Sequence, residues 1–168
     1  IDISKAFDTL SWGFLLEELR ARGFGARWCS WVCGLLSTAT TSVLINGELS
    51  APFALAQGVR QGDPLSPVLF IIAMDTLQGM LLWATQRQVL TDMGLGREIP
   101  RASIFADDAV LFFKPHSNDL QVISAVLQLF GQASDLRINL QMSSVTCIHY
   151  EEDLASLVAE HFQCQKQG

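Results

Sequence analysis

Two adjacent aspartates inside an apolar run constrain the fold of this chain more than any other feature. The flanking segments Ile104 to Ala106 and Ala109 to Phe113 are predicted as short strands, which puts Asp107 and Asp108 at the tip of a β-hairpin. Magnesium takes oxygen ligands and is usually held by one or two protein carboxylates plus substrate phosphates, which such a tip can offer. An ordinary turn is the alternative, since Asp is a common turn residue. The tetrapeptide alone leaves both interpretations open.

Two more segments accompany the aspartate pair. Residues 1–8 are Ile-Asp-Ile-Ser-Lys-Ala-Phe-Asp, and residues 57–67 are Gln-Gly-Val-Arg-Gln-Gly-Asp-Pro-Leu-Ser-Pro. Together with Phe105 to Asp108, in this order and spacing, they resemble the reverse transcriptase domain of LINE-type (non-LTR) retrotransposons, most closely those of plant genomes. The likeness covers nearly the whole chain. It implies an RNA-directed DNA polymerase by family, whose parent copies RNA into DNA by two-metal nucleotidyl transfer.

The elements predicted along the chain indicate an α+β fold, in which helices pack on one face of a mostly antiparallel sheet. Asn46-Gly47 separates two strand-forming runs and is a strong hairpin signal. Besides the hairpin around the aspartates, helices are predicted at 12–22, 27–36, 68–84, 118–133 and 151–161, and strands at 41–45, 49–55 and 144–149. The resemblance implies that residues 1–168 are a polymerase palm-like domain, a fragment from which fingers and thumb are missing.

The longest apolar stretch, Val68 to Ala84, is predicted as a buried helix. Asp75 and Gln78 interrupt it, so a membrane span is not expected and no membrane partner is predicted. Pro64 suits the first turn of this helix.

Two shorter helices are predicted before it. Ser11 would cap the helix at 12–22, because its hydroxyl can accept from a free backbone N–H of the first turn. The helix at 27–36 carries an apolar stripe that is predicted to be core and not a nucleic-acid stacking surface. The stripe is formed by Trp28, Trp31, Val32 and Leu35.

Composition limits the partners. The chain has 11 Lys and Arg against 17 Asp and Glu, a net charge of −6, which argues against a free-standing nucleic-acid binder. In the family that it resembles, the fingers and thumb carry much of the basic surface and the palm carries the metal-binding carboxylates. The four cysteines, Cys29, Cys33, Cys147 and Cys164, show no disulfide-dense pattern. Together with His161 they could form a zinc site, but buried thiols are the simpler interpretation.

The resemblance assigns the catalytic carboxylates. Asp2 and Asp107 would be the main metal ligands, Asp108 would be the second carboxylate of the pair, and Ile3 would assist through its backbone carbonyl. The implied cofactor is two Mg²⁺ ions, with Mn²⁺ as the alternative. A solvated terminal residue is the structural alternative for Asp2. Only Ile1 precedes Asp2, so this ligand is expected on a frayed chain end.

The resemblance also assigns a nucleotide site. Phe7 would clash with a ribose 2′ hydroxyl and so favour deoxynucleotides, Gln61 and Gly62 would shape the site, and Arg60 would help to neutralise phosphate. Phe105 would pack against the primer end. The structural alternatives are a core Phe at position 7 and, for the segment around Gln61, a loop that only leads into a buried helix.

Met142 is the main departure from the family pattern. Relatives typically have Lys at this position, near the leaving pyrophosphate as a proton donor, and Met can neither donate a proton nor neutralise charge. This change is expected to slow a polymerase without abolishing its activity. Because fingers and thumb are missing from the fragment, the isolated chain is expected to have little or no polymerase activity, and a non-catalytic relic of a decayed retroelement is the alternative function. A third interpretation, a metal-dependent phosphohydrolase, would leave residues 61–67 unexplained.

The partners implied for the full-length parent are an RNA template, a DNA primer and deoxynucleotides. An intracellular location, in the nucleus or the cytoplasm, is expected. The sequence leaves open the oligomeric state, the choice of template and any flanking endonuclease or RNase H domain.

Overall fold

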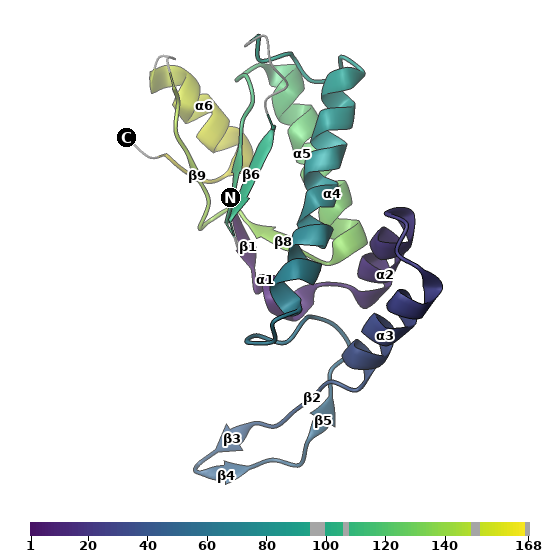
Figure 1. Ribbon diagram of the computed structural model, residues 1–168. Coiled ribbons are helices and arrows are strands. Elements are labelled where there is room, and N and C mark those ends of the chain that lie inside the picture. Colours follow the sequence, from purple (N-terminus) through teal and green to yellow (C-terminus); the bar gives the residue numbers. More distant parts are fainter. Residues whose placement is uncertain (95–99, 106–107, 149–151, 167–168) are drawn as a thin grey trace.

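The computed structural model describes residues 1–94, 100–105, 108–148 and 152–166, and has a sheet backed by long helices with an arm that reaches away from them (Figure 1). The helices are α1 (Ala6–Thr9), α2 (Trp12–Ala21), α3 (Ala26–Ser37), α4 (Ser66–Gln86), α5 (Ser117–Ser134) and α6 (Glu152–Phe162). The strands are β1 (Asp2–Ser4), β2 (Thr40–Thr41), β3 (Leu44–Ile45), β4 (Glu48–Leu49), β5 (Phe53–Ala54), β6 (Ala102–Phe105), β7 (Asp108–Leu111), β8 (Arg137–Asn139), β9 (Ser144–Val145) and β10 (Gln165–Lys166).

The main sheet has four strands in the order β6-β7-β1-β8, and each neighbouring pair is antiparallel. The strand nearest the N-terminus, β1, therefore lies inside the sheet. The Ile1 ammonium group donates to the carbonyl oxygen of Ala109 (2.6 Å), and the Ala109 N–H donates to the carbonyl oxygen of Ile1 (3.0 Å). The expectation that Asp2 lies on a frayed end is wrong, because β1 has hydrogen-bonding strands on both of its edges.

Successive residues of the main sheet alternate between two faces. One face packs on α4 and α5, and Ile3, Ala102 and Ala109 are buried there in the core cluster (Figure 1). We call the other one the open face; its side chains are exposed or half-buried and belong to Asp2, Ser4, Ser103, Phe105, Asp108, Val110, Arg137 and Asn139. The predicted α+β class, with an antiparallel sheet and helices on one face, is confirmed.

The hairpin around the aspartates is confirmed as β6 and β7, with one correction. Phe105 pairs with Asp108, so Asp108 is the first residue of β7 and not a residue of the hairpin tip. The second strand ends at Leu111, earlier than the predicted Phe113. Ala106 and Asp107 lie outside the described residues.

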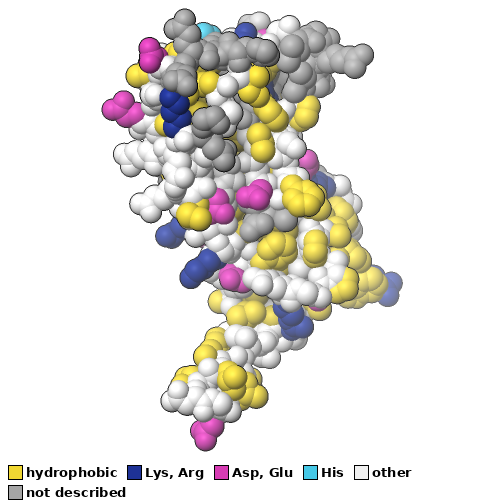
Figure 2. Space-filling model, turned by 90° about the vertical axis from the view of Figure 1, so that its left-hand side faces the viewer, with side chains coloured by type: hydrophobic (Ala, Val, Ile, Leu, Met, Phe, Trp, Pro, Cys, Tyr) yellow, Lys and Arg dark blue, Asp and Glu magenta, His cyan; other side chains and the backbone are white. Residues whose placement is uncertain are grey.

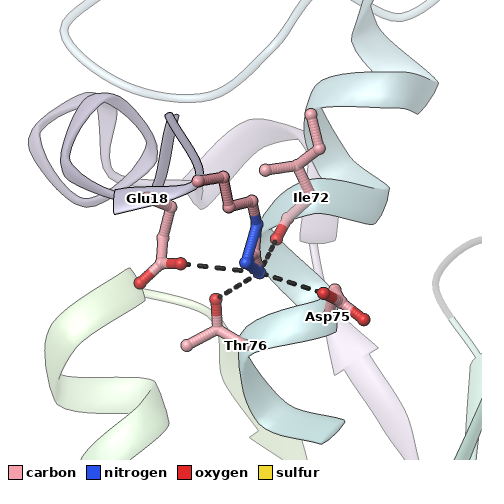
Figure 3. A network of polar contacts seen from close by, with 5 residues as sticks. Glu18, Ile72, Asp75 and Thr76 are labelled. Atoms are coloured by element: carbon pink, nitrogen blue, oxygen red, sulfur yellow. Dashed lines mark hydrogen bonds and ion pairs between the residues drawn. The ribbon is translucent and has the colours of Figure 1, made fainter. Parts of the chain in front are cut away.

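Helix α2 begins as the sequence predicts, since the Ser11 hydroxyl accepts from the Phe14 N–H (3.4 Å). Its other end is fixed to α4 by the Arg22 guanidinium (Figure 3). The Arg22 Nη2 lies 3.1 Å from Asp75 Oδ2 and 3.5 Å from Glu18 Oε2, and donates to the carbonyl oxygen of Ile72 (3.1 Å) and to the Thr76 hydroxyl (3.3 Å). Because the site is partly exposed, water screens these ion pairs, and the network orients α2 more than it stabilises the fold.

The predicted core stripe of α3 is confirmed at Val32 and wrong at Trp28, Trp31 and Leu35, which are exposed. The buried residues of the helix are Cys29, Val32 and Leu36. The smaller side chains of this neighbouring stripe let α3 pack against α2. Trp31 instead lies under the Arg27 guanidinium, 4.8 Å from the ring centroid.

The arm, residues 40–54, is the predicted hairpin in two short ladders. Asn46 and Gly47 have φ of 52° and 89°, as a two-residue type I′ turn requires, and join β3 to β4. Nearer the body β2 pairs with β5, and the two ladders are separated around Pro52, which has no N–H to donate. Hydrophobic side chains gather along the arm (Figure 2), and the exposed ones are Val43, Leu44, Ile45, Leu49 and Phe53.

Helix α4 supplies the largest part of the core. Its buried residues recur at helical spacing and are Ser66, Leu69, Phe70, Ala73, Met74, Leu77, Leu81 and Ala84. The prediction of a buried helix holds for this side alone, since Val68, Ile71 and Trp83 are exposed. By length and composition alone this helix could also cross a membrane. The helix begins at Ser66, so Pro67 lies in its first turn, and the prediction of Pro64 there is wrong. Pro64 belongs to the preceding turn, where Asp63 Oδ1 accepts from the Leu65 N–H (2.8 Å).

The region after β8 is only partly as predicted. The strand expected at 144–149 has two residues, Ser144 and Val145, and pairs in parallel with β10 outside the main sheet. The last helix is confirmed as α6 and packs on α5, where the Ser124 hydroxyl and the His161 Nε2 are 3.1 Å apart.

A buried polar network joins both ends of the connection between α4 and β6 to α5. Asp119 is fully buried and accepts from the Thr91 N–H (3.2 Å) and the Thr91 hydroxyl (2.9 Å). The Arg101 guanidinium, in a residue 3% exposed, donates to the carbonyl oxygen of Thr91 (2.5 Å). Thr91 thus provides hydrogen-bond partners for two buried charged side chains, Asp119 and Arg101, which do not form an ion pair with each other.

We expect Asp119→Ala to lower the free energy of unfolding by about 2–3 kcal/mol, because the Thr91 donors lose their buried acceptor. Urea denaturation measures this. The matched control is Asp153→Ala, at an exposed aspartate of α6, which should change the free energy by about 0.5 kcal/mol or less. Equal effects of the two substitutions would contradict the role given to this network.

Candidate metal and nucleotide site

Two of the predicted carboxylates face each other across neighbouring strands. Asp2 pairs with Asp108 of β7 on one side and with Asn139 of β8 on the other. Because Ile1 and Ala109 exchange both of their backbone hydrogen bonds, Asp2 and Asp108 form the next, non-hydrogen-bonded pair. In such a pair the Cα atoms are about 4.5 Å apart and the side chains are at their closest. The two carboxylates therefore lie side by side on the open face.

This pair is suited to a cation. Neither carboxylate has a hydrogen bond or ion pair with another described residue, and like charges that directly face each other destabilise a sheet. Carboxylate oxygens are ligands that a hard divalent ion prefers. The Asn139 amide oxygen, on the strand beside Asp2, accepts from the Met142 N–H (3.4 Å). The described residues contain no cluster of three or more His, Cys, Asp or Glu suited to a metal, and the predicted ligand Asp107 lies outside them.

A buried hydroxyl holds Asp2 in place. Ser143 accepts from the Asp2 N–H at 3.1 Å and donates to the carbonyl oxygen of Asn139 at 2.8 Å, so it links β1 to the end of β8. Ile3 is buried, which leaves only its backbone carbonyl for the predicted metal contact. That contact stays a prediction.

The second motif lies against the segment that follows Asp2. The Val59 N–H donates to the carbonyl oxygen of Phe7 (2.6 Å), and the Gly58 N–H donates to that of Leu10 (2.8 Å). The Trp12 indole N–H donates in turn to the carbonyl oxygen of Gly58 (2.6 Å). Residues 58–61 are therefore fixed beside α1, which follows Asp2 closely in the chain.

The predicted nucleotide-site residues of this loop differ in their partners. The Gln61 side-chain amide donates to Asp8 Oδ1 (3.3 Å). The Arg60 guanidinium donates to the carbonyl oxygen of Thr38 at the end of α3 (3.4 Å). Gly62 has φ of 89° and open space around it. Their nucleotide contacts stay predictions.

Two aromatic rings were predicted to contact the nucleotide and the primer. Phe7 is half-buried and stacks on Phe70 of α4, with centroids 4.9 Å apart and planes 19° from parallel. This contact fixes the ring and is compatible both with a core role and with exclusion of a 2′ hydroxyl. Phe105 is 83% exposed on the open face, opposite Asp108, where a primer end could reach it.

Three residues near the carboxylates were not predicted as part of the site. Arg137 and Asn139 share the open face with Asp2, and Ser143 holds its backbone. The alternation Arg-Ile-Asn, with an apolar residue between two polar ones, is the signal of a half-buried strand that could have placed the first two. Met142 is 71% exposed in the turn after β8, and its N–H donates to the carbonyl oxygen of Asn139 (3.2 Å).

The zinc site considered for the cysteines finds no support among the described residues. Cys29 is buried and Cys33 is exposed, one helical turn apart on α3, and all four thiols are free. Burial raises the pKa of the Cys164 thiol, which disfavours the thiolate that zinc requires.

Residues 1–163 match the family model described as "Reverse transcriptase (RNA-dependent DNA polymerase)". The chain is 40% identical over 114 residues, 67% of its length, to the "Retrovirus-related Pol polyprotein from type-2 retrotransposable element R2DM" of Drosophila melanogaster. It is 33% identical over 146 residues, 86% of its length, to the "Transposon TX1 uncharacterized 149 kDa protein" of Xenopus laevis. The chain spans 10% and 11% of these relatives. The chain is also 37% identical over 67 residues, 39% of its length, to the "Uncharacterized mitochondrial protein AtMg01250" of Arabidopsis thaliana, and the expected likeness to plant elements stays a prediction.

We expect Gly58→Ala to destabilise the fold far more than Gly62→Ala. Both glycines have positive φ, 80° and 89°, but a Cβ at position 58 would lie 2.6 Å from the carbonyl oxygen of Asp8, whereas position 62 is open. Left-handed strain alone costs about 1–2 kcal/mol, and overpacking adds about 1–3 kcal/mol at position 58. Urea denaturation of both variants measures the difference. Similar losses would show that the loop does not need its close approach to α1.

We expect Asp108→Asn to stabilise the metal-free chain by about 0.2–1 kcal/mol, because it removes one of two facing like charges. With Mn²⁺ added the order should reverse, since only the wild-type pair gains free energy from a bound ion. Urea denaturation with and without Mn²⁺ measures both effects. Asp153→Asn on α6 is the control and should follow the wild type in both conditions. Equal stabilisation of the Asp108 variant and the wild type by Mn²⁺ would argue against a metal site here.

Proposed function

The chain belongs to the reverse transcriptase (RNA-dependent DNA polymerase) family, and we propose that it is the palm of a non-LTR retrotransposon polymerase. The observation that carries this proposal is the Asp2–Asp108 pair on the open face, with the loop of Gln61 fixed against the segment that follows Asp2. Inner-strand placement gives Asp2 the rigid support that a metal ligand needs. The full-length parent would copy an RNA template from a DNA primer and use deoxynucleotides.

The residues present fit the two divalent ions that this chemistry uses. Asp2 and Asp108 would hold them together with Asp107 and the carbonyl of Ile3. When bound, such ions activate the primer 3′ hydroxyl and stabilise the leaving pyrophosphate. Mg²⁺ is the proposed cofactor, with Mn²⁺ as the alternative.

The neighbouring residues would select and orient the nucleotide. The Phe7 ring, held against Phe70, would exclude a ribose 2′ hydroxyl. Gln61 and Gly62 would shape the site, Arg60 would approach phosphate if it released its bond to the Thr38 carbonyl, and the exposed Phe105 ring would pack on the primer end. We place this activity inside the cell, in the nucleus or the cytoplasm.

A non-catalytic relic is the second candidate, and one observation favours it. Met142 is exposed in the turn beside Asn139, so an uncharged side chain stands where the resemblance implies a proton-donating Lys. General acid catalysis typically contributes about 10²–10⁴-fold. Its loss would leave a polymerase slow and is not sufficient to abolish it.

Primer extension on an RNA template tests this function. The 168-residue chain should show little or no extension, and in a longer chain of the same element Met142→Lys should raise turnover by about 10²-fold. Leu157→Lys, on the exposed side of α6, is the charge-matched control and should leave turnover unchanged. Asp2→Asn, added to the longer chain that carries Met142→Lys, should abolish its activity.

Three outcomes would revise the proposal. Extension by the 168-residue chain at the rate of a full-length relative would show that the fingers and thumb are not needed. No extension by the longer chain, with or without Met142→Lys, would favour the relic. Activity that survives Asp2→Asn would remove the metal site from the mechanism.

A further inference from the structure

Arg137 lies on the open face next to the carboxylates. It pairs with Ser4 across β1 and β8, in the same register that pairs Asn139 with Asp2. Ile138, between the two, packs against the core, so the side chains of Arg137 and Asn139 project from the opposite face. Two residues along a strand are about 7 Å. The Ser4–Arg137 row is therefore one such step from the row that contains Asp2 and Asp108.

The direction of this step is informative. From Asp2, the strand runs through Ser4 to Lys5 and then into α1, which contains Phe7. The loop of Gln61 packs against this helix. The row of Arg137 is thus one step from the carboxylates in the direction in which β1 runs toward α1. Lys5 is exposed there in the left-handed conformation, with φ of 51°.

The guanidinium of Arg137 has no hydrogen bond or ion pair with another described residue. Arginines with a structural role in this chain differ, since Arg22 contacts Glu18 and Asp75, and Arg101 donates to the carbonyl oxygens of Thr91 and Phe112. In a chain of net charge −6, an unpaired arginine on the same face as unpaired carboxylates marks a place for an anion beside a cation site.

We propose that Arg137 binds the polyphosphate of the incoming nucleoside triphosphate, with Ser4 beside it as a hydroxyl donor. This rests on the proposed function, because a metal at Asp2 and Asp108 would bring the polyphosphate to this face. A guanidinium suits phosphate because it is always charged and donates two parallel hydrogen bonds. Arg137 would supply the positive charge that Met142 lacks, but it would not act as a proton donor, since a guanidinium does not lose its proton.

Binding measurements on the purified chain test this proposal. Mn²⁺ alone, titrated by electron paramagnetic resonance, reports the metal site, and magnesium tripolyphosphate, titrated by calorimetry, reports the anion subsite without a base or sugar. Arg137→Ala should weaken tripolyphosphate binding by about tenfold, the loss of one charge-assisted hydrogen-bonded pair, and leave Mn²⁺ affinity within about twofold. Arg137→Lys should recover part of the loss.

Arg20→Ala is the matched control, because Arg20 is also exposed and its side chain also has no partner among the described residues, but it lies on α2. It should bind tripolyphosphate like the wild type, and thermal unfolding of every variant checks that the fold is kept.

The ways in which these measurements can fail are distinguishable. If the wild type binds Mn²⁺ and loses it in Asp2→Asn, but Arg137→Ala and Arg20→Ala bind tripolyphosphate equally, the inference is wrong and the metal site stands. If the wild type binds Mn²⁺ but not tripolyphosphate, the inference is also wrong and the metal site stands. If the wild type binds neither ligand, both the inference and the proposed function fail. Weaker binding of a single-stranded oligodeoxynucleotide by Arg137→Ala, with tripolyphosphate unaffected, would assign Arg137 to the nucleic-acid backbone and overturn the proposal.

Discussion

The insertion of β1 between β7 and β8 is the interaction on which the rest of the structure depends. Without it, the hairpin of β6 and β7 would have no connection to β8 within the main sheet. The strand has only three residues, yet it contributes Ile3 to the core and Asp2 to the open face. Its stability comes from strands on both edges and from the Ser143 hydroxyl, because three residues have little strand preference of their own.

The open face carries an electrostatic cost that the fold tolerates. Asp2 and Asp108 face each other without a described counter-ion, held there by backbone hydrogen bonds and by the buried residues on the other face. A sheet selected only for stability would place opposite charges or a hydroxyl pair across these strands. The residues that break this rule are the ones that the resemblance assigns to catalysis, which is where departures from local stability are expected.

Local sequence patterns predicted most of the helices and turns, whereas the pairing of strands far apart in the sequence was not predicted. The Ser11 cap, the Asn46-Gly47 turn and the helix at α4 follow from residues within a few positions of each other. The inner position of β1 depends on pairing with residues over a hundred positions away, which no local pattern encodes. On α3, two neighbouring stripes of side chains have helical spacing, and the stripe with the smaller side chains is the one that packs against α2.

The candidate site shows the same division. Asp2 and Asp108 could be assigned from the resemblance, but their direct opposition, and the positions of Asn139 and Arg137 beside them, come only from the register of β1. The Gln61 loop reaches the same place by another route, since Gly58 alone permits its backbone to approach the carbonyl oxygens of α1. Both routes end on residues 2–10. A displacement of this short segment would therefore separate the carboxylates and release the loop together, so the metal and nucleotide halves of the site should form or fail as one unit.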